Sequence, residues 1–142
     1  MCGGVKYRQD DELHTVYFPR PDARLPLRLK TGDQRLVTWG RRREEAGGLP
    51  PGGWARLDSV RAGKWQRYGP SPVLIQVESF MEKDDAGNSH WYELAGEDYI
   101  QGLVARDGEM DRVYVVTVSP EDPQHAAVHD RWPRIVSRSN TL

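Results

Sequence analysis

The only cysteine of the 142-residue chain is Cys2, which directly follows the initiating methionine. Residues this close to a terminus fray unless contacts hold them, so a cysteine at this position is not expected to have a structural role. If Met1 is removed, Cys2 carries a free α-amine and a thiol on adjacent carbon atoms. An α-amine with a pKa of about 7.7 to 8.0 is appreciably neutral near pH 7, so it is a nucleophile where a lysine is mostly protonated. Gly3 and Gly4 allow the backbone to approach a ligand closely.

Three other places carry groups that could take part in chemistry: the Trp54-Ala55-Arg56 triplet, Glu82, and the His-Asp-Arg-Trp-Pro segment 129–133. Taken alone, Glu82 fits a surface ion pair and His129 a structural histidine. His125 and His129 are four residues apart, but the Pro-Glu-Asp-Pro sequence before them favours a loop, and no HExxH pattern is present. We expect no metal site and no cofactor, since no glycine-rich loop has phosphate- or dinucleotide-binding spacing.

The net charge of −1 hides an uneven distribution along the chain. Segment 20–43 has eight basic residues against two acidic ones, and segment 78–111 has ten acidic residues against two basic ones. This asymmetry suits a polyanion bound on one side, and two solvated faces are the alternative interpretation. Tryptophan beside positive charge can stack a nucleic-acid base of any identity. We favour core packing for Trp39 and Trp91 and leave Trp54 open. The candidate DNA-contacting residues from this reasoning are Trp39, Arg41, Arg42, Arg43 and Trp54.

Apolar periodicity indicates the elements that would position these residues. Alternating or continuous apolar runs predict strands over 34–40, 72–82, 89–94, 98–106, 111–120 and 131–137. Short Gly/Asp/Asn loops separate the later runs, so we expect consecutive strands to pair antiparallel. Segment 47–53 predicts a loop, and segment 54–65 a short helix ending near Gly63. The pattern indicates one α+β domain over residues 1–142, mainly antiparallel β with few short helices.

Composition excludes two classes of protein. Five Trp and six Tyr are too many for a solvated, disordered tail. No apolar run has transmembrane length, and no basic segment followed by an apolar one marks a signal peptide, so we expect no membrane association and a cytoplasmic protein. A single cysteine forms no internal disulfide, which suits a reducing compartment.

Together the reactive segments resemble the SOS response-associated peptidase (SRAP) family. The corresponding family elements read MCGR, WGL, NARSET, CLIPADGFYEW, AGL and HDRMP. Two departures are visible: Trp54 stands where the family has Asn before Ala-Arg, and FMEK stands where the family has FYEW. The matching segments of this chain are MCGG at 1–4, TWG at 38–40, WARLDS at 54–59, VLIQVESFMEK at 73–83, YIQGL at 99–103 and VTVSPEDPQHAAVHDRWPRIV at 116–136, which contains HDRWP.

The resemblance implies a barrel-like fold and a covalent sensor of abasic sites in single-stranded DNA, acting in the DNA damage response. In that family the exposed Cys condenses with the ring-opened aldehyde of the abasic sugar to form a thiazolidine, a DNA–protein cross-link. By correspondence, Glu82 would transfer protons during capture, His129 would orient or protonate the sugar oxygen, and Arg56 would contact phosphate through its guanidinium fork. The implied partner is abasic single-stranded DNA, bound by a monomer.

Two alternatives stay open. An N-terminal-nucleophile hydrolase would use the Cys2 thiolate against an amide, including the bond after Met1, with His129 as base. The family name records an inference of this kind. A non-catalytic DNA-binding module would keep the fold and a basic face after losing active-site residues, and Trp54 in place of Asn is the feature that favours it.

Overall fold

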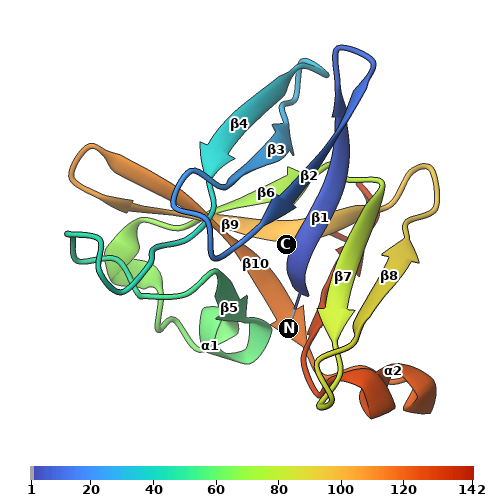
Figure 1. The fold of residues 1–142 in the computed structure, drawn as a ribbon. Helices are drawn as coiled ribbons and strands as arrows, with labels where there is room; N and C mark the ends of the chain where they lie inside the picture. The colour runs from blue at the N-terminus through green and yellow to red at the C-terminus, as the bar shows by residue number, and fades with distance from the viewer. Residues whose placement is uncertain (1) are drawn as a thin grey trace.

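The computed structural model describes residues 2–142, which form two β-sheets with short helices between the strands (Figure 1). The smaller sheet is antiparallel throughout and has the order β2-β1-β7-β8. Its strands are β1 (Cys2–Gln9), β2 (Glu12–Tyr17), β7 (Ser79–Lys83) and β8 (Ser89–Glu93).

The larger sheet has the order β11-β10-β9-β6-β3-β4. The short strand β5 (Trp54–Arg56) pairs parallel with β10, and β12 (Ile135–Val136) pairs with β9. The helical segments are α1 (Leu57–Arg61), the 3-10 turn η1 (Gln66–Tyr68) and α2 (Pro123–Val128). The remaining strands are β3 (Arg24–Arg28), β4 (Gln34–Thr38), β6 (Ser71–Ile75), β9 (Tyr99–Asp107), β10 (Met110–Val118) and β11 (Trp132–Pro133).

Strands β9 and β10 are buried on both faces, which explains their nearly continuous apolar sequences. Val104 and Val113 face the core between the two sheets, whereas Leu103 and Tyr114 face a second core under α1 and η1. Neighbouring residues of a strand point to opposite faces, so a strand with a core on each side needs apolar residues at successive positions.

The mainly β, α+β prediction is confirmed, but neither sheet closes on itself among residues 2–142, so the barrel-like part is not confirmed. The single strand predicted over 72–82 is wrong: β6 ends at Ile75 in the larger sheet and β7 starts at Ser79 in the smaller one. Buried residues occur on both sides of this change of sheet, so the sequence pattern does not mark where one strand ends and the next begins.

Two predictions about helices also need correction. The helix expected over 54–65 starts only at Leu57, because Trp54–Arg56 pair with β10. The loop expected before His125 is helix α2 instead. The Asp122 carboxylate accepts a hydrogen bond from the Gln124 amide at 2.8 Å, and Pro123 occupies the first helical turn, where its missing N–H costs nothing.

The helices described in residues 2–142 fall short of the length and apolar character needed to cross a membrane.

Candidate functional site

A β-bulge at the start of β1 sets the direction of the Cys2 side chain. Gly4 lies opposite Met81 of β7 and Cys2 lies opposite Glu82, with a shift of register between Cys2 and Gly4. Regular alternation would put Cys2 on the same face as Gly4, but the extra residue reverses it. Cys2 is fully buried in the core between the sheets together with Val5. The bulge therefore brings Cys2 and Glu82, which are distant in the sequence, to one position on the inner face.

Burial controls the protonation of this pair. Glu82 is fully buried, and the loss of hydration raises the pKa of its carboxyl group to about 7. Burial also raises the pKa of the Cys2 thiol far above its ordinary value, and the nearby charge of Glu82 raises it further. The Cys2 Sγ donates to the carbonyl of Gly4 at 3.6 Å. Near pH 7 Cys2 is thus a thiol, while Glu82 is divided between its protonated and ionised forms.

Two hydrogen bonds hold the backbone of the N-terminal segment. The indole Nε1 of Trp54 donates to the carbonyl of Cys2 at 2.7 Å, and the amide of Phe18 donates to the carbonyl of Gly3 at 3.1 Å. The Phe18 and Trp54 rings pack with centroids 4.8 Å apart. The sequence analysis left Trp54 open between core packing and DNA contact. In the structure Trp54 is half-buried, and its hydrogen bond holds the backbone of Cys2.

Trp39 and Trp91, which the sequence analysis placed in the core, differ from each other. Trp39 is fully buried and its Nε1 donates to the carbonyl of Gly53 at 3.0 Å, so the core interpretation of Trp39 is confirmed. A base cannot stack on a ring with no exposed surface. Trp91 on β8 is half-buried but belongs to neither core cluster, so the core interpretation of Trp91 is wrong.

His129 lies at the C-terminal end of α2 and is held within its own segment. Its Nδ1 accepts a hydrogen bond from the Arg131 amide at 3.0 Å and lies 3.1 Å from the Asp130 carboxylate. Of the three predicted catalytic residues, Cys2 and Glu82 are therefore the two that the strand register brings together. The described contacts of His129 lie in α2 and in the segment that follows it.

Arg56 lies in β5 beside Thr117 of β10 and is exposed. Its guanidinium contacts the Asp58 carboxylate through two bonds of 3.1 Å. Arg131, which the sequence analysis did not single out, donates to the Thr117 carbonyl at 2.8 Å and to the Thr117 hydroxyl at 3.1 Å. Burial lowers the pKa of Arg131, and the positive charge of Arg56 adds to this effect. Two guanidinium groups thus approach the end of β10.

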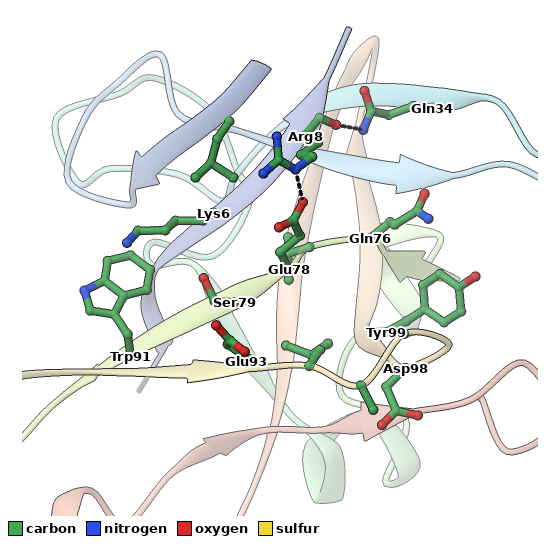
Figure 2. Close-up of a pocket in the computed structure, with 15 residues that line it drawn as sticks. Lys6, Arg8, Gln34, Gln76, Glu78, Ser79, Trp91, Glu93, Asp98 and Tyr99 are labelled. Carbon is green, nitrogen blue, oxygen red and sulfur yellow. Dashed lines mark hydrogen bonds and ion pairs between the residues drawn. The ribbon is translucent and has the colours of Figure 1, made fainter. Parts of the chain in front are cut away.

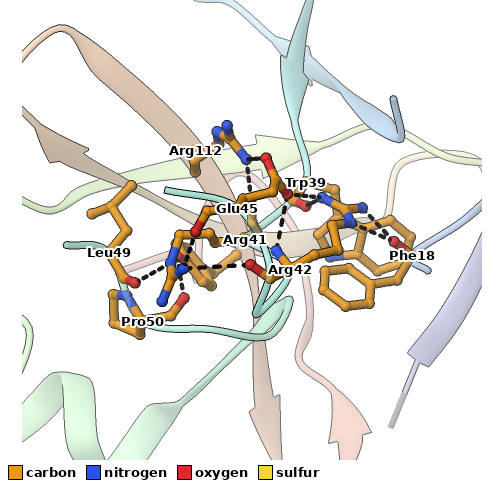
Figure 3. A network of polar contacts seen from close by, with 10 residues as sticks. Phe18, Trp39, Arg41, Arg42, Glu45, Leu49, Pro50 and Arg112 are labelled. Carbon is orange, nitrogen blue, oxygen red and sulfur yellow. Dashed lines mark hydrogen bonds and ion pairs between the residues drawn. The ribbon is translucent and has the colours of Figure 1, made fainter. Parts of the chain in front are cut away.

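Figure 3 shows that two of the three consecutive arginines at 41–43 point inward. Arg42 donates to the carbonyl of Phe18 and to that of Trp39 at 2.7 Å, and its guanidinium lies 4.3 Å from the Phe18 ring centre. Arg41 donates to the carbonyls of Leu49 and of Glu45, at 2.6 and 2.5 Å. These hydrogen bonds fix the loop between β4 and β5. Of the three arginines, Arg43 is the exposed one.

Four surface hollows of residues 2–142 are lined by residues other than Cys2, Glu82 and His129. The described part of the chain has no cluster of three or more His, Cys, Asp or Glu side chains arranged to hold a metal ion. No protein-family model matches the chain, and no match is found among curated proteins or solved structures. The resemblance to the SRAP family therefore rests on the sequence motifs.

Proposed function

We propose that the chain binds single-stranded DNA and that Cys2, after loss of Met1, captures the ring-opened aldehyde of an abasic site as a thiazolidine. The supporting observation is the position of the Cys2 thiol opposite a buried carboxyl group whose pKa is about 7. The loss of Met1 lies outside the described residues. The barrel-like arrangement of the SRAP fold, the monomeric state, the cytoplasmic location and the role in DNA damage belong to the same proposal.

The proposed reaction needs one group that both donates and accepts a proton. The neutral α-amine of Cys2 adds to the aldehyde carbon and gives a carbinolamine. Protonated Glu82 donates to the carbinolamine hydroxyl, and water leaves with formation of an iminium ion. The Cys2 sulfur then bonds to the same carbon, its proton passes to the Glu82 carboxylate, and the carbon–nitrogen double bond becomes a single bond in a five-membered ring. Glu82 ends in its starting state, and one water molecule is released.

A carboxyl group with a pKa near the working pH is suited to both transfers. An amine alone would leave a readily hydrolysed imine, which could promote strand cleavage by β-elimination, whereas closure of the ring by the thiol removes that intermediate. Arg56, exposed beside β10, is the proposed phosphate contact on the DNA, together with the exposed Arg43.

A non-catalytic DNA-binding module is the second candidate, and the complete burial of Cys2 favours it. Covalent capture requires the Cys2–Gly3 backbone to move outward, which breaks the bonds from Trp54 and Phe18. Hydrolysis by a Cys2 thiolate has less support, because burial raises the pKa of the thiol and the neighbouring Glu82 carboxylate raises it further.

A denaturing gel separates these candidates. Protein that begins at Cys2 is incubated with single-stranded DNA containing an abasic site, an intact base or a borohydride-reduced abasic site. Covalent capture predicts a heat-stable slower band with the first DNA only, and its loss in Cys2→Ser, whose oxygen analogue closes a far less stable ring. A binding module gives salt-sensitive retention on a native gel and no such band.

A further inference from the structure

The four-stranded sheet has a second face that points away from Cys2. Across this face the register places Tyr17 of β2 beside Gly4 of β1, Gly4 beside Met81 of β7, and Met81 beside Trp91 of β8. Tyr17 packs directly on the backbone of Gly4, since a Cβ atom at Gly4 would lie 3.0 Å from the Tyr17 ring. The Tyr17 and Trp91 rings meet edge to face with centroids 6.3 Å apart. Two aromatic rings thus lie side by side on the outer surface.

Two lysines lie on this face, and one of them contacts a ring. Lys6 is two residues beyond Gly4 on β1, and its Nζ lies 4.2 Å from the centre of the Trp91 ring. Figure 2 shows the Lys6 side chain extended over Trp91. Lys83 is two residues beyond Met81 on β7, so it faces the same side, and it is exposed. We call the set Gly4, Lys6, Tyr17, Met81, Lys83 and Trp91 the outer face.

Tyr17 is 39% exposed, Trp91 is half-buried, and neither belongs to a core cluster. The two charged side chains of the outer face are Lys6 and Lys83, and Glu93, opposite Ser79 in the register, lies on the same side of the sheet. Aromatic rings beside ammonium groups, spread on an open β-sheet, match a ligand with flat apolar rings joined by negative charges.

We propose that the outer face is a non-covalent contact surface for single-stranded DNA. An unpaired base stacks on Tyr17 or Trp91, and the flanking phosphates contact Lys6 and Lys83. Stacking does not depend on base identity, because every base has a π face, so the surface is sequence-tolerant. Duplex DNA has its base faces covered and offers only its phosphates. Lys6 moves from the Trp91 ring to a phosphate when the base takes its place.

The far end of this sheet limits where the strand lies. There Arg8, Glu78 and Glu93 line a hollow of ≈ 640 Å³ that extends to Lys6 and Trp91 (Figure 2). The Arg8 guanidinium is held by the Glu78 carboxylate at 2.7 Å, and Glu93 adds a second negative charge. The side of the hollow with Glu78 and Glu93 repels phosphate, so we place the strand on the other side of Trp91, over Tyr17 and beside the Cys2–Gly4 segment. This inference takes its class of ligand, single-stranded DNA, from the proposed function, but it does not depend on covalent capture.

Fluorescence anisotropy of a short labelled oligothymidylate without abasic sites tests the surface. All proteins carry Cys2→Ser, so that no capture takes place. Trp91→Leu removes a stacking ring from outside the core and is expected to weaken binding roughly 5-fold or more. Lys6→Gln is expected to make the slope of log affinity against log salt shallower by about 0.7. The matched control is Arg67→Gln, which removes one charge from the exposed turn η1 and should leave both quantities unchanged.

Equal binding by Trp91→Leu and the parent, or an equal loss in Arg67→Gln, overturns the proposal, as does absence of binding by the parent. Lysine acetylation read by mass spectrometry gives a test without substitution. Oligothymidylate should protect Lys6 and Lys83, and unchanged labelling of both overturns the proposal. Cross-linking of abasic DNA is read separately in protein that begins at an intact Cys2, so failure of the outer face and failure of covalent capture give different results.

Discussion

The buried carboxyl group of Glu82 should make stability fall as pH rises. Its pKa is about 7 in the folded protein, against an ordinary value of 4.5. Between these two values the folded chain keeps a proton that the unfolded chain has lost, so the free energy of unfolding decreases with increasing pH. The whole difference amounts to roughly 3 kcal/mol and is reached above the folded-state pKa. Glu82→Gln resembles the protonated form and removes this dependence.

Urea unfolding of both proteins at about pH 4.5 and about pH 8.5 measures the effect. Near the lower pH their stabilities should almost agree, and near the higher pH Glu82→Gln should be more stable by roughly 3 kcal/mol. Glu93→Gln, on the exposed end of the neighbouring strand β8, is the matched control and should follow the wild type. A difference between wild type and Glu82→Gln that stays constant with pH would refute the reasoning. It would also remove the carboxyl group poised for proton transfer.

Two further pairs of variants test the packing around the site. Arg42→Gln leaves the carbonyls of Phe18 and Trp39 with fewer donors in a buried position, so it should cost ~3 kcal/mol in urea unfolding, whereas exposed Arg43→Gln should stay within about 0.5 kcal/mol. Similar costs for both would contradict a structural role for Arg42. At Gly53 a Cβ atom would lie 2.6 Å from the Phe18 ring, whereas at Gly96 nothing lies within 4 Å. Thermal unfolding should show Gly53→Ala destabilised by ~1–3 kcal/mol and Gly96→Ala nearly unchanged, and equal melting temperatures would rule out the close contact.

Much of the β structure follows from local sequence. The strands predicted over 34–40, 89–94, 98–106 and 111–120 correspond to β4, β8, β9 and β10. In these segments apolar periodicity and turn residues agree, so local preference and tertiary packing favour the same state. Trp54–Arg56 is different, because pairing with β10 decides its conformation and no local pattern marks a strand of three residues.

The candidate site depends on features that no sequence pattern encodes. The motifs select Cys2 and Glu82, but the bulge that turns Cys2 inward follows from the register of β1 against β7. The basic segment predicts DNA contact equally for Arg41, Arg42 and Arg43. Composition does not distinguish an arginine that donates to carbonyl groups inside the fold from one that faces solvent. Lys6 and Trp91 lie far apart in the chain, and only strand pairing brings them together.

The central claim is that the amine and the thiol of one residue together close a ring on a sugar aldehyde. Intact mass spectrometry of protein that begins at Cys2, after reaction with abasic single-stranded DNA, tests it most directly. The account predicts a product whose mass equals protein plus DNA minus one water molecule, unchanged by borohydride and carried by the peptide that starts at residue 2. A product attached to a lysine, or one that survives only after borohydride reduction, would contradict it.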